Sequence, residues 1–452
     1  MDKRLLVLCA VAAFAMCFIS YPDGAASVLL ILFVAVPVVW YIQKKTEEKE
    51  FLTNIFLLAL LARIGLGVLI HYFNLRGVFG PDATLYDAVG QRLVEMWLGI
   101  PYPDDFATRY AENPGKSGWG MNYLVAAIYL VFGRGILIAQ SFCGAVGAIT
   151  APMVYFCAEK IFNNRKVARN SAVLIALFPA FIVWSAQLLK DGLIIFLLVC
   201  SMTAILQLQK KFSYATVAFL IASVSGIIAL RFYIFYFVAV SIVGSFFIGA
   251  ETSARTIVRN IIIMVVIGLS LTYLGVIRNA TENLEFYGNL ERVQISRQDL
   301  AASADSGFGK DIDVSTTEGA IFAIPIGLAY LFFAPFPWQV TKVNQILLLP
   351  ETFLWWALIP MMIVGLWYTI NNRLRKAFPI LIFSLMLTLS YSIFQGNVGM
   401  VYRQRTQIQV FLFMFIAVGW TLMQERRENK KLLMKARDQK IRQRIQAQRV
   451  ES

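Results

Sequence analysis

Histidine is nearly absent from this 452-residue chain, which contains a single one, His71. One imidazole excludes metal sites that need two histidines. Cysteine is scarce as well, and the five present are Cys9, Cys17, Cys143, Cys157 and Cys200. All lie inside apolar runs, where a thiol behaves as a small hydrophobe, so we expect no disulfide framework and no cysteine-based metal site. Any catalysis therefore falls to carboxylates and arginines.

Charged residues are also few. They make up 15% of the chain, hydrophobic residues make up 58%, and the mean hydropathy is +0.66. An ordinary soluble domain has about 25% charged residues. The chain instead holds about a dozen apolar runs, and helices of roughly 20 residues are what a bilayer core of about 30 Å requires. We predict an all-α, polytopic transmembrane helix bundle without a soluble domain.

The basic residues are distributed along the chain as in other membrane proteins. The formal net charge is +14, and the basic residues gather in short loops between apolar runs and in the tail. That distribution is typical of membrane orientation, so we expect no nucleic-acid partner. The tail, residues 425–452, holds ten Lys or Arg and four Asp or Glu. It is predicted to be a solvated cytoplasmic helix that touches anionic membrane lipids.

Three parts follow from these patterns. Residues 1–50 form an N-terminal helical hairpin and a charged cytoplasmic connector, residues 51–424 form the transmembrane catalytic domain, and residues 425–452 form the basic tail. The first apolar run has an alternative interpretation. Lys3 and Arg4, a short apolar core and the stretch Ala13-Phe14-Ala15 also fit a cleaved signal peptide.

Two apolar runs, 121–133 and 320–334, are short for a span. If the first crossed the membrane, the basic loop at 163–169 would lie outside, against the positive-inside bias. We therefore predict that both are re-entrant or interfacial. About twelve spans remain, with 167–187 as a single one. Both termini then lie in the cytoplasm, the protein lies in the inner membrane, and residues 74–135 and 278–350 form outward loops.

The first outward loop begins with Gly80-Pro81-Asp82 and continues to Tyr86. Asp82 follows the apolar run 51–73, so this acid lies where the chain leaves the membrane and enters water. It has two interpretations. One is an active-site residue at the membrane surface. The other is a helix start, where Pro and Asp are both common.

The predicted topology places further polar residues at the same outer face. They are Arg109, Lys190, Asp191, Arg231, Tyr233, Arg403 and Arg405, with Asp311 and Asp313 in the loop that begins at Arg278. Charged residues at the rim of a helix bundle are functional candidates. Each of two residues also has a structural interpretation. Lys190 could extend its ammonium group to the lipid headgroups, and Asp191 could cap the start of a helix. Arg403 and Arg405, read as part of a short loop, could form an anion clamp, because the guanidinium fork matches phosphate oxygens.

Carboxylates and arginines at one membrane surface indicate a reaction class. A carboxylate can take a proton from an attacking hydroxyl, and arginines can neutralise charge on a departing phosphate. A donor with a phosphate head and a hydrocarbon tail needs both groups. Transfer of a sugar from a polyprenyl phosphate to a glycan, lipid or protein acceptor fits these residues.

The order of these features resembles the GT-C class of integral-membrane glycosyltransferases, which includes protein O-mannosyltransferases and lipid A aminoarabinose transferases. The resemblance covers roughly residues 51–424. Its motifs are Pro-Asp-Ala-Thr-Leu-Tyr around Asp82, Phe178-Pro179 and Leu188-Leu189-Lys190-Asp191. The chain also resembles similar bacterial polysaccharide-locus proteins at Leu230-Arg231-Phe232-Tyr233, Pro335-Phe336-Pro337-Trp338 and Tyr402-Arg403-Gln404-Arg405.

The resemblance implies roles for these residues. Asp82 would be the general base in an inverting transfer, and Asp191 would orient the acceptor or hold a divalent metal ion together with Asp82. Arg231, Arg403 and Arg405 would bind the lipid phosphate, and the loop after Arg278 would shape the acceptor site. Tyr86 and Tyr233 would stack on a sugar, and Arg109 and Lys190 are further substrate-binding candidates.

The chain departs from the family in two places. Ala83 follows Asp82 where many protein mannosyltransferases carry an acidic pair, and two spans precede the usual first one. Substrate identity and metal use stay open on these grounds. Two other functions also stay open: a polysaccharide polymerase or ligase with a lipid-diphosphate donor, and a lipid or solute transporter.

Overall fold

The computed structural model describes residues 2–112, 118–248, 254–273, 288–302, 306–309, 312–340 and 343–451. Throughout these ranges the regular elements are helices, and one isolated antiparallel bridge joins Gly307 to Asn397. The all-α prediction is confirmed. Arg278 and Asp311 lie outside the described residues.

The chain opens with the predicted hairpin, α1 (Lys3–Ile19) and α2 (Asp23–Lys45), which packs beside α3 (Lys49–Tyr72) and α8 (Ile136–Phe162). Small residues run along the buried length of α8 and let neighbouring backbones approach closely, as in other membrane bundles. On α8, for example, a side chain on Gly147 would collide with Ser185 at 2.5 Å. This close packing sets the position of the chain segment that carries Ser185.

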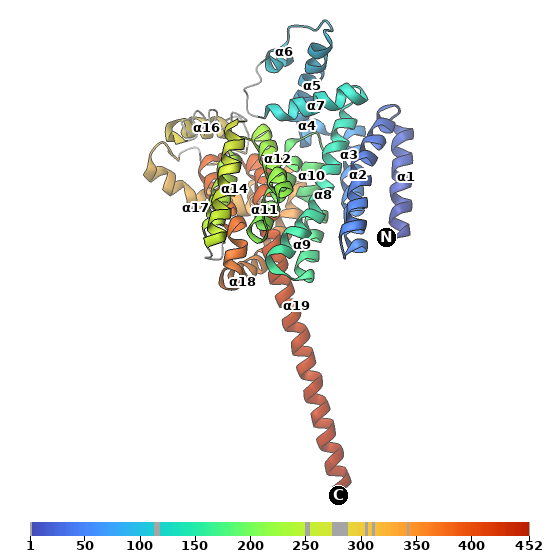
Figure 1. Ribbon diagram of the computed structural model, residues 1–452, viewed down its shortest axis with the longest axis vertical. Helices are drawn as coiled ribbons and strands as arrows, with labels where there is room; N and C mark the ends of the chain where they lie inside the picture. The colour runs from blue at the N-terminus through green and yellow to red at the C-terminus, as the bar shows by residue number, and fades with distance from the viewer. Residues whose placement is uncertain are drawn as a thin grey trace.

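The other helices complete a bundle around α8, α11 and α19 (Figure 1). Their bounds are α4 Arg76–Phe79, α5 Asp82–Leu98, α6 Phe106–Ala111, α7 Trp119–Phe132, α9 Arg165–Leu177, α10 Pro179–Ser185, α11 Lys190–Lys210, α12 Tyr214–Leu230, α13 Ile234–Ile248, α14 Ala254–Tyr273, α16 Leu290–Ala302, α17 Thr317–Phe333, η1 Pro337–Gln339, α18 Val343–Phe394 and α19 Val398–Glu451.

The predicted number of about twelve spans is not confirmed. Six of the described helices are long and apolar enough to cross a membrane, or seven if the bent pair α9 and α10 is one span. The difference has two sources. Apolar helices such as α12 have 17 residues or fewer, and α18 counts once although non-helical torsions at Arg373 divide its 52 residues.

Ion pairs identify one end of the bundle. Glu48, in the connector after α2, binds Arg165 at 3.5 Å and accepts a hydrogen bond from Arg169 at the start of α9. Lys166 lies 3.9 Å from Glu428 in the tail half of α19. The connector, the 163–169 loop and the tail therefore share one end, the arrangement expected if that end is cytoplasmic. The tail helix points away from the bundle there (Figure 1).

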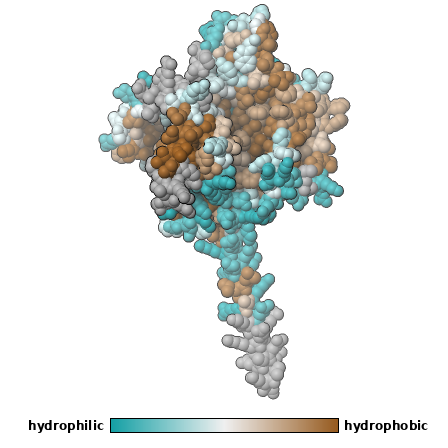
Figure 2. All heavy atoms as spheres, in the orientation of Figure 1, coloured by the Kyte–Doolittle hydropathy of each residue, from teal (hydrophilic) through white to brown (hydrophobic). Residues whose placement is uncertain are grey.

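The opposite end carries α5, α6 and α7, which Figure 1 shows at the top, with α7 lying across the ends of the other helices. This orientation agrees with the prediction that the 121–133 run does not cross. In Figure 2, apolar side chains cover much of the middle of the visible face, and hydrophilic ones gather toward the tail. Asp82 and Arg109, two of the residues predicted to face outward, lie in α5 and α6 at this end.

The predicted span 167–187 is broken in two. Helices α9 and α10 meet at an angle of 55° around Phe178. Pro179 has no N–H, so the carbonyl of Ile175 loses its usual donor. Arg63, fully buried on α3, supplies replacements. It donates to the carbonyls of Ile175 at 3.1 Å and Ala176 at 3.0 Å, and to the hydroxyl of Ser185 at 2.9 Å.

We expect Arg63→Met to destabilise the protein by on the order of 3 kcal/mol, because a buried carbonyl without a donor costs roughly 1–3 kcal/mol. Thermal unfolding in detergent measures the effect. Arg63→Lys is the matched variant and should lie between wild type and Arg63→Met, since one ammonium reaches fewer of these acceptors. Equal unfolding temperatures for wild type and Arg63→Met would contradict this role.

Candidate active site

One guanidinium joins three distant parts of the chain at the end of the bundle opposite the tail. Arg403 donates from Nη1 to Oδ2 of Asp82 at 2.7 Å and from Nε to Oδ2 of Asp191 at 2.6 Å. Asp82 and Asp191, which the sequence placed on the same face, therefore converge on one side chain. Neither acid acts as a helix cap through its side chain, although each lies in the first turn of its helix.

A second arginine completes the cluster from the turn between α12 and α13. Arg231 donates from Nη2 to Oδ1 of Asp191 at 3.4 Å, so both oxygens of this carboxylate face a guanidinium. The side chain of Asp191 is 0% exposed and that of Arg231 is 7% exposed. A fully buried carboxylate is tolerated only when paired in this way.

One buried donor in the cluster has no acceptor. Among the described residues, Nη1 of Arg231 is buried without a hydrogen-bond partner. Nη2 of Arg403, in contrast, lies 2.6 Å from Asp191 Oδ2 and is part of that ion pair. Buried donors without acceptors are rare in folded proteins. An oxyanion beside Arg231 would supply the missing acceptor.

The Asp82 segment is docked directly against the Asp191 segment. A side chain on Gly80 would meet Oε1 of Gln187 at 2.6 Å and the Leu189 side chain at 3.2 Å. Glycine lets the 80–82 turn lie on the 187–189 stretch, and Pro81 then starts α5 with Asp82 in its first turn. Close backbone packing thus brings the first acid to the second.

Asp191 is positioned by equally close contacts on its own side. The next residue, Gly192, packs so tightly that a side chain there would lie 2.7 Å from Cβ of Ser185 on α10. Ser185 is the residue that Arg63 binds at the broken span. The break between α9 and α10 therefore sets where α11 begins, and with it the position of Asp191.

Aromatic side chains border the cluster. The Arg403 guanidinium lies 5.7 Å from the ring centre of Trp184, and that of Arg231 lies 5.9 Å from the ring of Tyr233. The Tyr233 and Tyr391 hydroxyls are 3.2 Å apart, and Tyr391 donates to Gln407 at 2.6 Å. Rings stacked on guanidinium groups hold the arginines in place.

Tyr86 lies one turn along α5 from Asp82 and is buried. Burial, and then the negative charge of Asp82, raises the pKa of Tyr86 well above its usual range. Its hydroxyl therefore stays protonated near neutral pH. It can donate a hydrogen bond to a substrate oxygen near Asp82.

Lys190 adds positive charge at the same place. It begins α11, and its Nζ would lie 2.8 Å from a side chain added at Gly118, a residue with φ of +88° at the start of α7. The cluster otherwise balances two carboxylates, Asp82 and Asp191, against Arg231 and Arg403. Lys190 therefore makes the group as a whole cationic, which favours an anionic ligand.

Two predicted site residues lie elsewhere. Arg109 is on α6, and its exposed side chain faces Asp104 at 3.7 Å. Arg405 was expected beside Arg403 on a short loop, but α19 begins at Val398 and both are helical. Residues two apart on a helix do not share a face. Arg405 is buried and donates to the backbone carbonyl of Ala334 at 3.0 Å.

The acids do not suit a divalent metal as they stand. Arg403 occupies the position between the Asp82 and Asp191 carboxylates that a shared ion would need. No group of three or more His, Cys, Asp or Glu side chains in the described part of the chain could hold a metal. A hard divalent cation needs several oxygen ligands, and here the Oδ2 atoms of both acids already bind Arg403.

Three residues that support or border the cluster were not predicted from the sequence: Arg63, Trp184 and Tyr391. Arg63 carried a usable signal, because an ionisable residue in the middle of the apolar run 51–73 is a functional candidate by itself. Trp184 and Tyr391 carried none. Aromatic residues are common in membrane helices, and only the fold shows which ones face the arginines.

No protein-family model matches this chain, and no curated protein matches it. Among solved structures, it is similar to the archaeal oligosaccharyltransferase AglB from Archaeoglobus fulgidus, solved in complex with an inhibitory peptide and a dolichol-phosphate. The identity is 12% and the TM-score 0.49, with 88% of this chain covered. The chain spans 52% of that protein, about half its length. A likeness at this level does not establish a shared function.

Proposed function

We propose that the chain is a membrane glycosyltransferase that moves a sugar from a polyprenyl-phosphate donor to an acceptor hydroxyl at the outer face of the membrane. The observation that carries the proposal is the bridge from Arg403 to both Asp82 and Asp191. It unites a partly exposed carboxylate, a buried carboxylate and, through Asp191, a second guanidinium with one unpartnered donor at one end of a helix bundle.

Asp82 is the general base in this proposal. Arg403 binds only its Oδ2 oxygen, and among the described residues Oδ1 accepts no hydrogen bond, while the side chain is 44% exposed. Oδ1 can therefore take the proton of an acceptor hydroxyl. Asp191 is a positioning residue, since it is fully buried and holds Arg231 and Arg403 in place.

The transfer balances with these groups alone. The acceptor oxygen attacks the anomeric carbon as its proton passes to Asp82 Oδ1. The bond between the anomeric carbon and the phosphate oxygen breaks, and the electron pair leaves with the polyprenyl phosphate. Arg231, Arg403 and Lys190 meet the negative charge that develops there. Attack opposite to the leaving group inverts the sugar carbon.

The direct test uses the purified protein in lipid nanodiscs. A panel of polyprenyl-monophosphate and polyprenyl-diphosphate sugars is added with a mixture of glycan acceptors, and mass spectrometry follows the released lipid and the product. Release of polyprenyl phosphate from at least one monophosphate donor is expected. Turnover of diphosphate donors alone would support the polymerase or ligase reading, and no turnover of any donor would contradict the proposal.

Chelation should leave the reaction unaffected, because Arg403 fills the place of a shared metal ion. We expect equal rates before and after EDTA treatment and dialysis, and no rise in unfolding temperature with added Mg²⁺ or Mn²⁺. A rate that falls with EDTA and returns with either ion would show that Arg403 gives way to a metal.

A further inference from the structure

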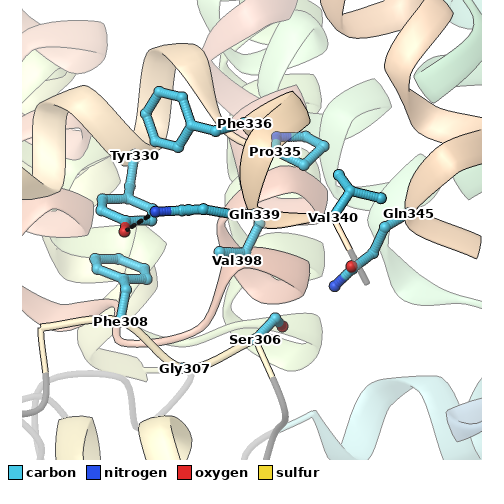
Figure 3. A pocket seen from close by; sticks show the side chains of 10 residues that line it. All are labelled: Ser306, Gly307, Phe308, Tyr330, Pro335, Phe336, Gln339, Val340, Gln345 and Val398. Atoms are coloured by element: carbon cyan, nitrogen blue, oxygen red, sulfur yellow. Dashed lines mark hydrogen bonds between the residues drawn. The ribbon is translucent and has the colours of Figure 1, made fainter. Parts of the chain in front are cut away.

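A hollow at the beginning of α19 has polar side chains that are already paired. It encloses about 260 Å³, and its lining includes Ser306, Tyr330, Gln339 and Val398 (Figure 3). Gln339 donates from Nε2 to the Tyr330 hydroxyl at 3.1 Å, and the Ser306 hydroxyl donates to Asn397 Oδ1 at 3.1 Å. These pairs leave little in the hollow that would hold a polar ligand.

Further along α19, buried polar residues do not all find partners in this way. Gln404, Arg405, Gln407 and Gln409 are all buried in the bundle. Polar side chains inside a membrane bundle are costly and call for a specific interaction. Gln404 accepts from Gln395 at 2.6 Å, and Arg405 donates to a backbone carbonyl at the end of α17. The Gln409 amide has no hydrogen-bond partner among the described residues.

Gln407 is the one of these four that leads to the acid and arginine cluster. It follows Arg403 by four residues, so the two side chains share a face of α19. Its Oε1 accepts a hydrogen bond from the Tyr391 hydroxyl at 2.6 Å, and the Tyr391 and Tyr233 hydroxyls lie 3.2 Å apart. Gln407 therefore ends a hydrogen-bonded chain that runs from α19 through α18 to the turn before α13.

The Gln407 amide sets the direction of this chain. A phenol has a single proton, so a Tyr391 hydroxyl that donates to Gln407 can only accept from Tyr233. Both phenol protons are then directed along the chain toward Gln407. Both hydroxyls also lie within electrostatic range of the Arg231 guanidinium. A guanidinium can only donate, so this order presents it with phenol lone pairs instead of protons.

The side chain of Arg231 depends on its aromatic neighbour more than its backbone does. The backbone is held on both sides, because its N–H donates to Ile227 at 2.7 Å and its carbonyl accepts from Ile234 at 3.2 Å. Among the described residues the side chain makes one hydrogen bond, to Asp191 at 3.4 Å, which is long for a charged pair. The Tyr233 ring, with its centre 5.9 Å from the guanidinium, is the second contact that holds it.

We propose that Gln407 is a positioning residue for Arg231 and acts through Tyr391 and Tyr233. The amide anchors the Tyr391 hydroxyl, Tyr391 anchors the Tyr233 ring, and that ring holds the guanidinium whose Nη1 lacks an acceptor among the described residues. The use of Arg231 for a lipid phosphate rests on the proposed function. The placement of Arg231 by Gln407 does not.

Equilibrium binding of a radiolabelled polyprenyl phosphate to the purified protein measures the consequence. Gln407→Leu and Tyr391→Phe should each weaken binding about tenfold, the loss expected for one hydrogen bond. The double variant should bind no more weakly than the single ones, because both changes break the same chain. Gln409→Leu is the matched control. It removes an equally buried amide of the same helix and should bind as wild type.

Nitrogen-15 NMR of the arginine side chains tests the placement without any lipid. The Nε signal of Arg231, assigned by its loss in Arg231→Lys, should shift and broaden in Gln407→Leu and Tyr391→Phe and stay unchanged in Gln409→Leu. An unchanged signal or wild-type affinity in Gln407→Leu would overturn the assignment. Equal effects in Gln409→Leu, or single losses that multiply to about a hundredfold in the double variant, would do the same.

The two measurements also separate this inference from the proposed function. A wild-type protein that binds no polyprenyl phosphate would contradict the proposed function. The Arg231 signal would then decide the role of Gln407 by itself, since it reports where the guanidinium lies whether or not a phosphate binds there.

Discussion

Asp82→Asn should remove sugar transfer almost completely and leave the fold intact. The amide keeps the shape of the side chain and can still accept a hydrogen bond from Arg403 through its oxygen, but it cannot take a proton from the acceptor. Loss of a general base lowers kcat by about 10²–10⁴-fold. Donor turnover measured by mass spectrometry gives the rate.

Asp104→Asn is the matched control for this prediction. Asp104 belongs to the same outward loop, its side chain is 84% exposed, and its contact with Arg109 spans 3.7 Å. The control should retain wild-type kcat, and both variants should unfold at wild-type temperature. Full activity in a well-folded Asp82→Asn protein would reject Asp82 as the base and favour a reaction that depends on the arginines alone.

Arg403→Gln should both destabilise the protein and inactivate it. Asp191, with a side chain that is 0% exposed, would keep only the longer contact to Arg231 at 3.4 Å. Breaking a buried charge pair by removing one partner costs roughly 3–5 kcal/mol. The unfolding temperature should therefore fall by several degrees, and the affinity for a polyprenyl phosphate should drop as well.

A double variant separates charge balance from catalysis. In Asp191→Asn/Arg403→Gln the buried network loses one charge of each sign, so part of the lost stability should return while transfer stays absent. The interaction between the two changes is read from the four unfolding temperatures of the cycle. Strict additivity of the two single effects would show that the Arg403 to Asp191 pair does not contribute to stability.

The sequence predicted the helical class and the convergence of Asp82, Asp191, Arg231 and Arg403 for a simple reason. Apolar runs and basic loops determine which ends of the helices lie together. Charged residues at those ends avoid lipid and therefore face one another or the interior of the bundle. The side-chain pairs themselves were not predictable. Whether Arg403 reaches one acid or both depends on how the beginning of α19 is placed against α5 and α11.

The position of the Arg405 side chain was not predictable from the sequence. The stretch Arg403-Gln404-Arg405 fits both a loop and a helix. In a loop both arginines can face the cluster, whereas in a helix Arg405 points away from Arg403. The helix places it behind α17. The bend at Pro179 is similar, because proline predicts a break but not that Arg63, far along the chain, supplies the missing donors.

Helix α19 runs without interruption from Val398 past Arg403 and on to the tail. Successive residues of an α-helix turn by about 100° and advance by about 1.5 Å, so one inserted residue between positions 398 and 403 would swing the guanidinium to another side. Arg403 at one end of the bundle and Glu428, which lies 3.9 Å from Lys166 at the other end, thus belong to one continuous helix. A rotation of the tail about the helix axis would therefore turn the Arg403 guanidinium relative to Asp82 and Asp191.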